Sequence, residues 1–116
     1  MKINKYSELA MNFAKYNTAD YPLIALSEEA GEVLGKIAKA ARKQGKNSEQ
    51  ILNEINAGMQ PELKESLIKE LGDVLWQWQA LCFEIGVSPD VVAVKNIEKL
   101  DSRLANDTII GEGDDR

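Results

Sequence analysis

Two short stretches of the sequence repeat one pattern that sets pairs of carboxylates in apolar surroundings. Residues 29–35 read EAGEVLG, and residues 70–76 read ELGDVLW. Each copy carries two acidic residues three positions apart. These residues are Glu29 and Glu32 in the first copy, and Glu70 and Asp73 in the second. Residues at this spacing are neighbours on one helix face, where their carboxylates can bind a hard cation such as Mg²⁺.

The rest of the composition excludes most other catalytic groups and favours a site for a hard divalent cation. The chain has no histidine and a single cysteine, Cys82. Ser-His-Asp catalysis, Cys-His catalysis and every histidine-based metal site are therefore excluded. Oxygen ligands alone favour Mg²⁺ or Mn²⁺ over Zn²⁺ or Cu²⁺. Because carboxylate-bound Mg²⁺ usually keeps waters and takes up substrate phosphates, the pattern points to a phosphate-bearing ligand.

Apolar residues recur at helical spacing along almost the whole chain, and no segment alternates with period two, which predicts an all-α fold. The first helix is expected from Asn4, as N-cap, to Tyr16, with Tyr6, Leu9 and Phe13 facing inward. Proline, serine and glycine mark the other boundaries. The expected helices span 22–45, 48–55 (a short one), 61–86 and 88–105.

The two long helices should form an antiparallel pair, because both carry an apolar stripe flanked by an acidic pair. Their apolar stripes are Leu26, Ala30, Val33 and Ile37 on one helix, and Leu67, Leu71, Val74, Trp78 and Leu81 on the other. Both acidic pairs flank these stripes, so all four carboxylates should converge. Two charges about 4 Å apart repel by roughly 4 kcal/mol at an effective dielectric of about 20, so a cation is needed there. Gly31 and Gly72, inside these helices, suggest close backbone approach.

The bulk properties limit the partners and the location. A chain of 116 residues forms one domain, expected over 1–105 with a tail at 106–116. A formal net charge of -5 argues against a nucleic acid polymer as partner. One cysteine, no apolar leader and no run of roughly 20 apolar residues predict a cytoplasmic protein without membrane contact.

Three phrases resemble the MazG family of all-α nucleotide pyrophosphohydrolases. They are LSEEAGEVLGKIAKAARK, LIKELGDVLWQWQAL and the ending NIEKLDSRLANDTIIGEGDDR. The resemblance implies an oligomeric bundle of four to five helices that uses Mg²⁺, or Mn²⁺ in its place, to split a ribo- or deoxyribonucleoside triphosphate into monophosphate and pyrophosphate. It implies that the metal ligands are Glu29, Glu32, Glu70 and Asp73. The two motifs lie further apart than in compact family members, so the loop 46–60 is a candidate insertion that touches substrate, and its role stays open.

Further residues are candidates for the reaction itself. Glu28 lies one turn from Glu32 and is the candidate general base; an outer metal ligand or a surface charge is the alternative. Phosphates are expected to bind a row on the last helix, where the resemblance places Asn96 and Lys99 near substrate. The full row is Lys95, Asn96, Lys99 and Arg103. Because Glu98 and Asp101 are interleaved, an ordinary charged face is the alternative.

A second apolar line on the 61–86 helix comprises Trp76, Ala80 and Phe83. It predicts a subunit interface, hence a homodimer or homotetramer; stacking of Trp76 on a base is the alternative. Two other functions stay open. One is phosphoribosyl-ATP pyrophosphohydrolase, which shares the acidic motifs, and the other is a noncatalytic acidic helical interaction protein.

Overall fold

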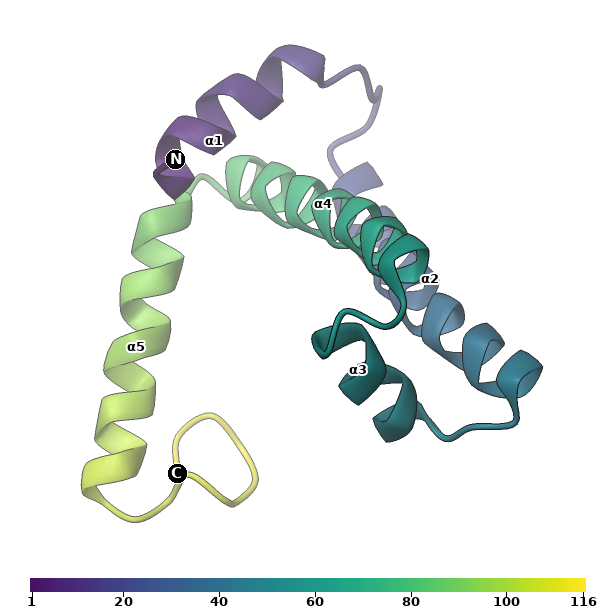
Figure 1. Ribbon diagram of the computed structural model, residues 1–116. Coiled ribbons are helices and arrows are strands. Elements are labelled where there is room, and N and C mark those ends of the chain that lie inside the picture. The colour runs from purple at the N-terminus through teal and green to yellow at the C-terminus, as the bar shows by residue number, and fades with distance from the viewer.

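The computed structural model describes residues 1–116 as five α-helices without a strand, which confirms the all-α prediction (Figure 1). A short 3₁₀ turn follows the first helix. The elements are α1 (Ile3–Ala10), η1 (Met11–Phe13), α2 (Tyr21–Gln44), α3 (Ser48–Asn56), α4 (Pro61–Glu84) and α5 (Pro89–Ala105). No helix in the chain combines the length and the apolar character that a membrane crossing requires.

Local chemistry explains most helix boundaries. α2, α4 and α5 each have proline in the first turn, where its missing N–H costs nothing. α2 is capped at its C-terminal end by Gly45, whose φ of 62° is left-handed and suits glycine. α3 begins with a capping box in which Asn47 and Gln50 each accept a hydrogen bond from the other's backbone N–H. The bounds predicted for these four helices are confirmed to within two residues.

The first helix is shorter than predicted. It ends at Ala10, and the backbone is already extended at Ala14. The hydroxyl of Tyr16 donates to Glu84 at 3.0 Å, and its ring packs edge-on against Trp76 at 6.3 Å. Leaving the helix lets Tyr16 make these contacts with α4, so tertiary packing overrides the helical pattern. Phe13 is 73% exposed, which contradicts its expected inward position.

Two other details of the first helix also differ from expectation. Its N-cap is Lys2, so Asn4 lies inside the helix. The side-chain oxygen of Asn4 instead accepts a hydrogen bond from the backbone N–H of Asp90 at 3.1 Å, which joins α1 to the start of α5. Leu9 is 40% exposed and does not face a core.

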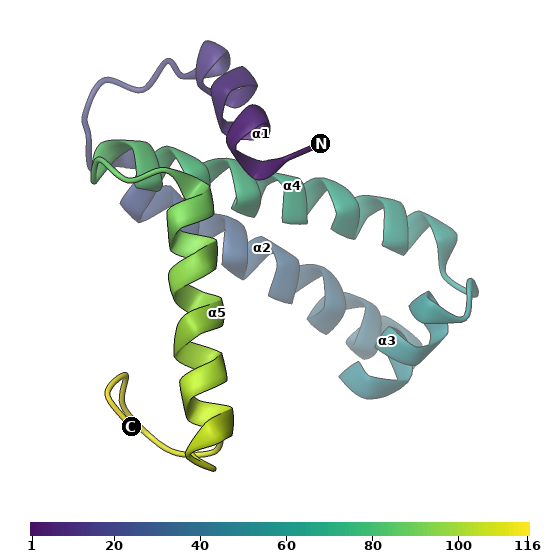
Figure 2. The ribbon, with the colours of Figure 1, turned by 90° about the vertical axis from the view of Figure 1, so that its left-hand side faces the viewer.

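The antiparallel pair of α2 and α4 forms the body of the molecule (Figures 1 and 2). At one end the side-chain amides of Gln44 and Gln60 bond to each other at 2.8 and 3.0 Å. α3 packs at this end and buries Ile51 completely. The stretch 46–60 is therefore mostly an ordered helix that closes the pair. α1 crosses α4 near the other end, and α5 extends away from the pair.

The line Trp76, Ala80 and Phe83 packs partly within the chain. The indole N–H of Trp76 donates to the carbonyl of Ala10 at 3.3 Å, and Ala80 is completely buried. The end of α1 thus contacts Trp76, and Ala80 is buried within the chain. Ala80 cannot lie in a subunit interface, and the interface prediction is wrong at that residue. Phe83 alone of the three is exposed.

A single chain has a small buried core. Only 11 of 116 residues are buried, and the radius of gyration is 17.2 Å, against roughly 13 Å for a compact domain of this length. Large apolar side chains remain uncovered on α2, α4 and α5. They include Leu34, Ile68, Leu71, Ile97 and Leu104.

Candidate active site

The antiparallel pairing brings the two acidic motifs face to face. Glu29 lies opposite Asp73, and Glu32 lies beside Glu70. One carboxylate oxygen from each of Glu29, Glu70 and Asp73 lies within 4.8 Å of the other two. The structure therefore brings three of the four predicted metal ligands into one cluster. Glu32 adjoins the cluster through Glu70, and we call these four residues the acidic cluster.

Crowding in the acidic cluster raises the pKa values of two carboxyl groups. Burial, followed by repulsion from Asp73 and Glu70, raises the pKa of Glu29 above its ordinary value of 4.5. The pKa of Glu32 is raised by a hydrogen bond with Glu70 and then by the charges of Glu70 and Glu29. In each case the ionised form is disfavoured. The cluster therefore carries more negative charge than its surroundings balance, which is the electrostatic condition for binding a cation.

The raised pKa values predict that the metal-free protein is more stable in mild acid than at neutrality. A carboxyl with a raised folded-state pKa contributes stability below its unfolded pKa, and this is lost as pH rises through the folded value. In EDTA, the melting midpoint should therefore rise as pH falls from about 7 toward about 5. Asp90 and Asp114, whose pKa values are lowered from 3.8, titrate below this window.

Thermal melts across this pH range would test the prediction. The matched variant is Glu29→Gln with Glu32→Gln, which removes both shifted groups and should flatten the dependence. If wild type and variant show the same pH dependence, the crowding of these carboxyls does not govern stability.

A lysine that the sequence reasoning missed partly balances the acidic cluster. The ammonium of Lys36 lies 3.4 Å from a carboxylate oxygen of Glu70. A cavity of about 340 Å³ adjoins this pair and is lined by Glu32, Gly35, Lys36, Lys39 and Glu70. Lys36 follows Glu32 by four residues, so the helical spacing alone could have indicated that it lies on the acidic face.

The residues predicted to bind phosphate lie elsewhere in the chain. Lys95 and Asn96 are exposed on α5, which extends away from the α2–α4 pair (Figure 2). The ammonium of Lys99 lies 3.3 Å from the carboxylate of Asp114 in the tail. Arg103 contacts the same carboxylate at 3.4 Å and the carbonyl of Gly113 at 3.1 Å. Within one chain, the structure does not bring this row to the acidic cluster.

The remaining predicted positions have simpler surroundings. Glu28 is exposed on α2 next to the acidic cluster, and its charge contributes to the raised pKa of Glu29. A methyl group added at Gly31 or Gly72 would meet nothing within 4 Å. The close backbone approach expected there does not occur within the chain. Gln77, one turn beyond Asp73, is buried, and its side-chain oxygen has no hydrogen-bond partner.

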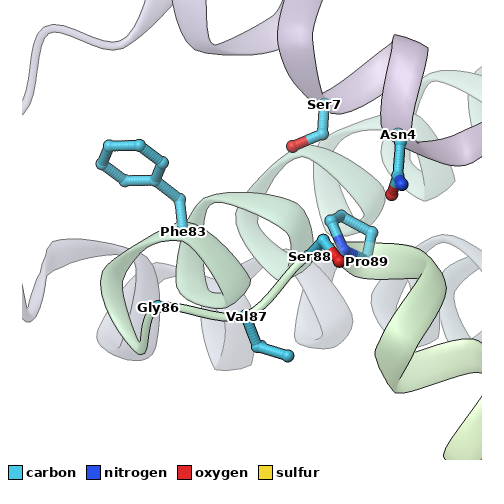
Figure 3. Close-up of a pocket in the computed structure, with 7 residues that line it drawn as sticks. All are labelled: Asn4, Ser7, Phe83, Gly86, Val87, Ser88 and Pro89. Carbon is cyan, nitrogen blue, oxygen red and sulfur yellow. The ribbon is translucent and has the colours of Figure 1, made fainter.

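Two further cavities lie toward the other end of the pair. One of about 390 Å³ is lined by Phe13, Lys15, Tyr16, Tyr21 and Trp76, and the rings of Tyr16 and Tyr21 stack at 5.6 Å. A cavity of about 480 Å³ lies between α1 and the turn from α4 to α5 (Figure 3). Its lining includes Asn4, Ser7 and Ser88 but no titratable side chain. Of these cavities, only the one beside Lys36 includes residues of the acidic cluster.

The donor set of the acidic cluster fits a hard divalent ion. All its ligand atoms are carboxylate oxygens, contributed by two adjacent helices. Mg²⁺ and Mn²⁺ prefer such donors, whereas Zn²⁺ and Cu²⁺ favour nitrogen or sulfur. Glu29, Glu70 and Asp73 could hold such an ion together, with Glu32 as a further ligand.

Comparisons with known proteins place these features in a family. A family model described as the MazG nucleotide pyrophosphohydrolase domain matches residues 18–106, which contain both acidic motifs and helices α2 to α5. The "Gene 37 protein" of Mycobacterium phage L5 is 32% identical over 96 residues, covering 83% of this chain and 75% of the phage protein. No solved structure matches the chain.

Proposed function

Because the chain belongs to the MazG nucleotide pyrophosphohydrolase family, we propose that it hydrolyses a nucleoside triphosphate to the monophosphate and pyrophosphate with Mg²⁺. The observation that carries the proposal is the convergence of Glu29, Glu70 and Asp73 within 4.8 Å, inside the matched residues. The reaction named in the description of the family and a cluster of carboxylate oxygens that could hold an ion support the same chemistry.

The residues of the acidic cluster would hold the ion. When bound, Mg²⁺ neutralises the phosphate oxygens and lowers the pKa of bound water. Glu29, Glu70 and Asp73 contribute the negative charge that retains it, and Glu32 adds a carboxyl beside Glu70. Because these carboxylates come from two adjacent helices, they would also help to position the triphosphate, and positioning is a large part of catalysis in phosphoryl transfer.

Glu28 is the proposed acceptor of the proton from the attacking water. Support for this role comes from its exposed carboxylate and from its charge, which acts on Glu29 of the acidic cluster. A general base must lie within hydrogen-bonding distance of the proton that it removes. Attack at the α-phosphorus then releases the monophosphate and pyrophosphate.

We further propose that the chain assembles as a homodimer or homotetramer. The small buried core and the extended shape leave Ile97 and Leu104 uncovered, at 58% and 70% exposure. A second copy would cover these side chains. It would also allow α5 of one chain to bring the predicted phosphate row, including Lys99, to the acidic cluster of another.

Replacing Ile97 by glutamate should shift the protein toward monomer, because a charge buried in an interface is costly unless it reaches water. Sedimentation would measure the change, and pyrophosphate release should fall with it. Glu98→Lys, a charge change at an exposed residue of the same helix, is the control and should leave the mass unchanged. A wild-type protein that sediments as a monomer would contradict the proposed assembly.

The proposed reaction is tested by a substrate screen. Wild-type protein with Mg²⁺ is incubated with each ribo- and deoxyribonucleoside triphosphate and with phosphoribosyl-ATP, and pyrophosphate is measured. We expect release from at least one nucleoside triphosphate. Release from phosphoribosyl-ATP alone would assign the other pyrophosphohydrolase activity. Release from none would leave a noncatalytic interaction protein.

A further inference from the structure

A groove continues from the acidic cluster along α2 toward the end of that helix. Lys36, Lys39 and Lys43 follow one another at spacings of three and four residues and so share a helix face. Lys36 and Lys39 line the cavity of about 340 Å³ beside Glu32 and Glu70. They also line a second cavity, of about 240 Å³, whose other residues are Ala40, Lys43, Gln44 and Leu63. We call these adjoining cavities the lysine groove.

The charge changes sign along the lysine groove. Its first cavity contains Glu32 and Glu70, whereas its second contains no acidic residue. Lys39 and Lys43 form no salt bridge, although Lys46 nearby is paired with Glu54 at 2.6 Å. The groove therefore offers carboxylates at one end and unpaired ammonium groups at the other. A ligand that fits this order carries a divalent cation at one point and excess negative charge beyond it.

We propose that the lysine groove binds the terminal phosphates of the substrate, with Lys36 and Lys39 contacting phosphate oxygens and Lys43 at the far end. This assignment rests on the proposed function, since it concerns the same substrate. Ammonium groups bind phosphate oxygens through charge-assisted hydrogen bonds. It gives the site phosphate ligands from the same chain as the acidic cluster, which the row on α5 does not supply within one chain.

The assignment also fixes the direction of the bound nucleotide. The terminal phosphates point along α2 toward α3, so the nucleoside points the opposite way. On that side, Trp76 follows Asp73 by one turn and lines an aromatic cavity with Tyr16 and Tyr21. An aromatic cavity at the nucleoside end and a lysine groove at the phosphate end match the polarity of a nucleoside triphosphate.

Lys36 has a second role in this arrangement. In the structure it is paired with Glu70 at 3.4 Å, and it thereby offsets part of the charge of the acidic cluster. A cation held by Glu70 would take over that function and release Lys36 to the phosphates. Removing Lys36 should therefore strengthen the binding of Mn²⁺ alone but weaken the binding of a polyphosphate.

Calorimetric binding of inorganic tripolyphosphate in the presence of Mg²⁺ tests the groove without turnover of a nucleotide. A charge-assisted hydrogen bond contributes about 1.5–3 kcal/mol, so Lys36→Gln and Lys39→Gln should each weaken binding by about tenfold or more. Lys39→Arg retains the charge and should restore most of the affinity. The control is Lys64→Gln, an exposed lysine on α4 outside both cavities, which should bind like wild type.

Two results would overturn the assignment. One is a wild-type protein that binds no tripolyphosphate, and the other is Lys39→Gln binding it as tightly as Lys64→Gln. The proposed function is judged separately, by pyrophosphate release from nucleoside triphosphates by the wild type. If the wild type releases pyrophosphate and Lys39→Gln binds tripolyphosphate as tightly as the wild type, the groove assignment alone is refuted. Lysine-dependent tripolyphosphate binding without any hydrolysis would refute the reaction and retain the groove.

Discussion

Replacing Glu70 by glutamine should abolish pyrophosphate release while leaving the helices intact. Glu70 contributes an oxygen to the cluster with Glu29 and Asp73, and it also adjoins Glu32 and Lys36. Glutamine keeps the shape but removes the charge that retains the ion, so activity should fall by at least about a hundredfold. Because one of several mutually repelling carboxylates is gone, stability without metal should be unchanged or slightly higher. Glu32→Gln should act in the same direction.

Circular dichroism and a pyrophosphate assay on the same sample would measure both outcomes. The control is Glu65→Gln, the same change at an exposed residue of α4, which should keep wild-type activity. A Glu70→Gln variant with full activity would remove that residue from the metal site. Lost helix content would mean that Glu70 supports the fold.

Chelation of divalent ions should remove all activity, and added Mg²⁺ or Mn²⁺ should restore it. With no histidine and one cysteine, the acidic cluster with the ion proposed to bind there is the constellation that would perform phosphoryl chemistry. The same ions should raise the melting midpoint, because binding only the folded state stabilises it by RT ln(1 + [L]/Kd), about 2.7 kcal/mol at about 100 times Kd. A melting scan in EDTA, Mg²⁺ and Mn²⁺ measures this without knowledge of the substrate.

The comparison variant for the scan is Glu29→Gln, which should lose most of the ion-dependent increase. A wild-type midpoint that responds to neither ion at millimolar concentration, together with no hydrolysis of any triphosphate, would contradict the catalytic proposal. The acidic cluster would then be better explained as a docking surface for a cationic partner.

The sequence predicts the parts of this fold that local chemistry decides. Pro22, Pro61 and Pro89 begin helices, and Gly45 ends one, because each residue restricts its own backbone. The acidic cluster follows from equally local facts. The acidic pairs have the same spacing on two long helices, so antiparallel pairing of these helices brings Glu29 to Asp73. Leu71, expected on the apolar stripe, is instead exposed.

The features that the sequence did not predict depend on contacts between residues far apart in the chain. The chain leaves the helix before Tyr16 because that side chain reaches Glu84, which no local pattern encodes. Helical spacing places Lys36 on the face of Glu32, but its ion pair with Glu70 depends on the neighbouring helix and is not encoded in that spacing. The direction of α5 is set by its contact with α1, so the separation of Lys99 from the acidic cluster could not be inferred from spacing.

Because a single chain buries few side chains, the proposed assembly would make the stability of the protein depend on its concentration. If a second copy supplies the missing burial, folding and association are one equilibrium, and the folded fraction rises with total concentration. Near the dissociation constant, a twofold drop in synthesis would then lower the assembled fraction as well as the total, so activity would fall by more than half. Expression level would thus act as a threshold for activity, with no dedicated regulator.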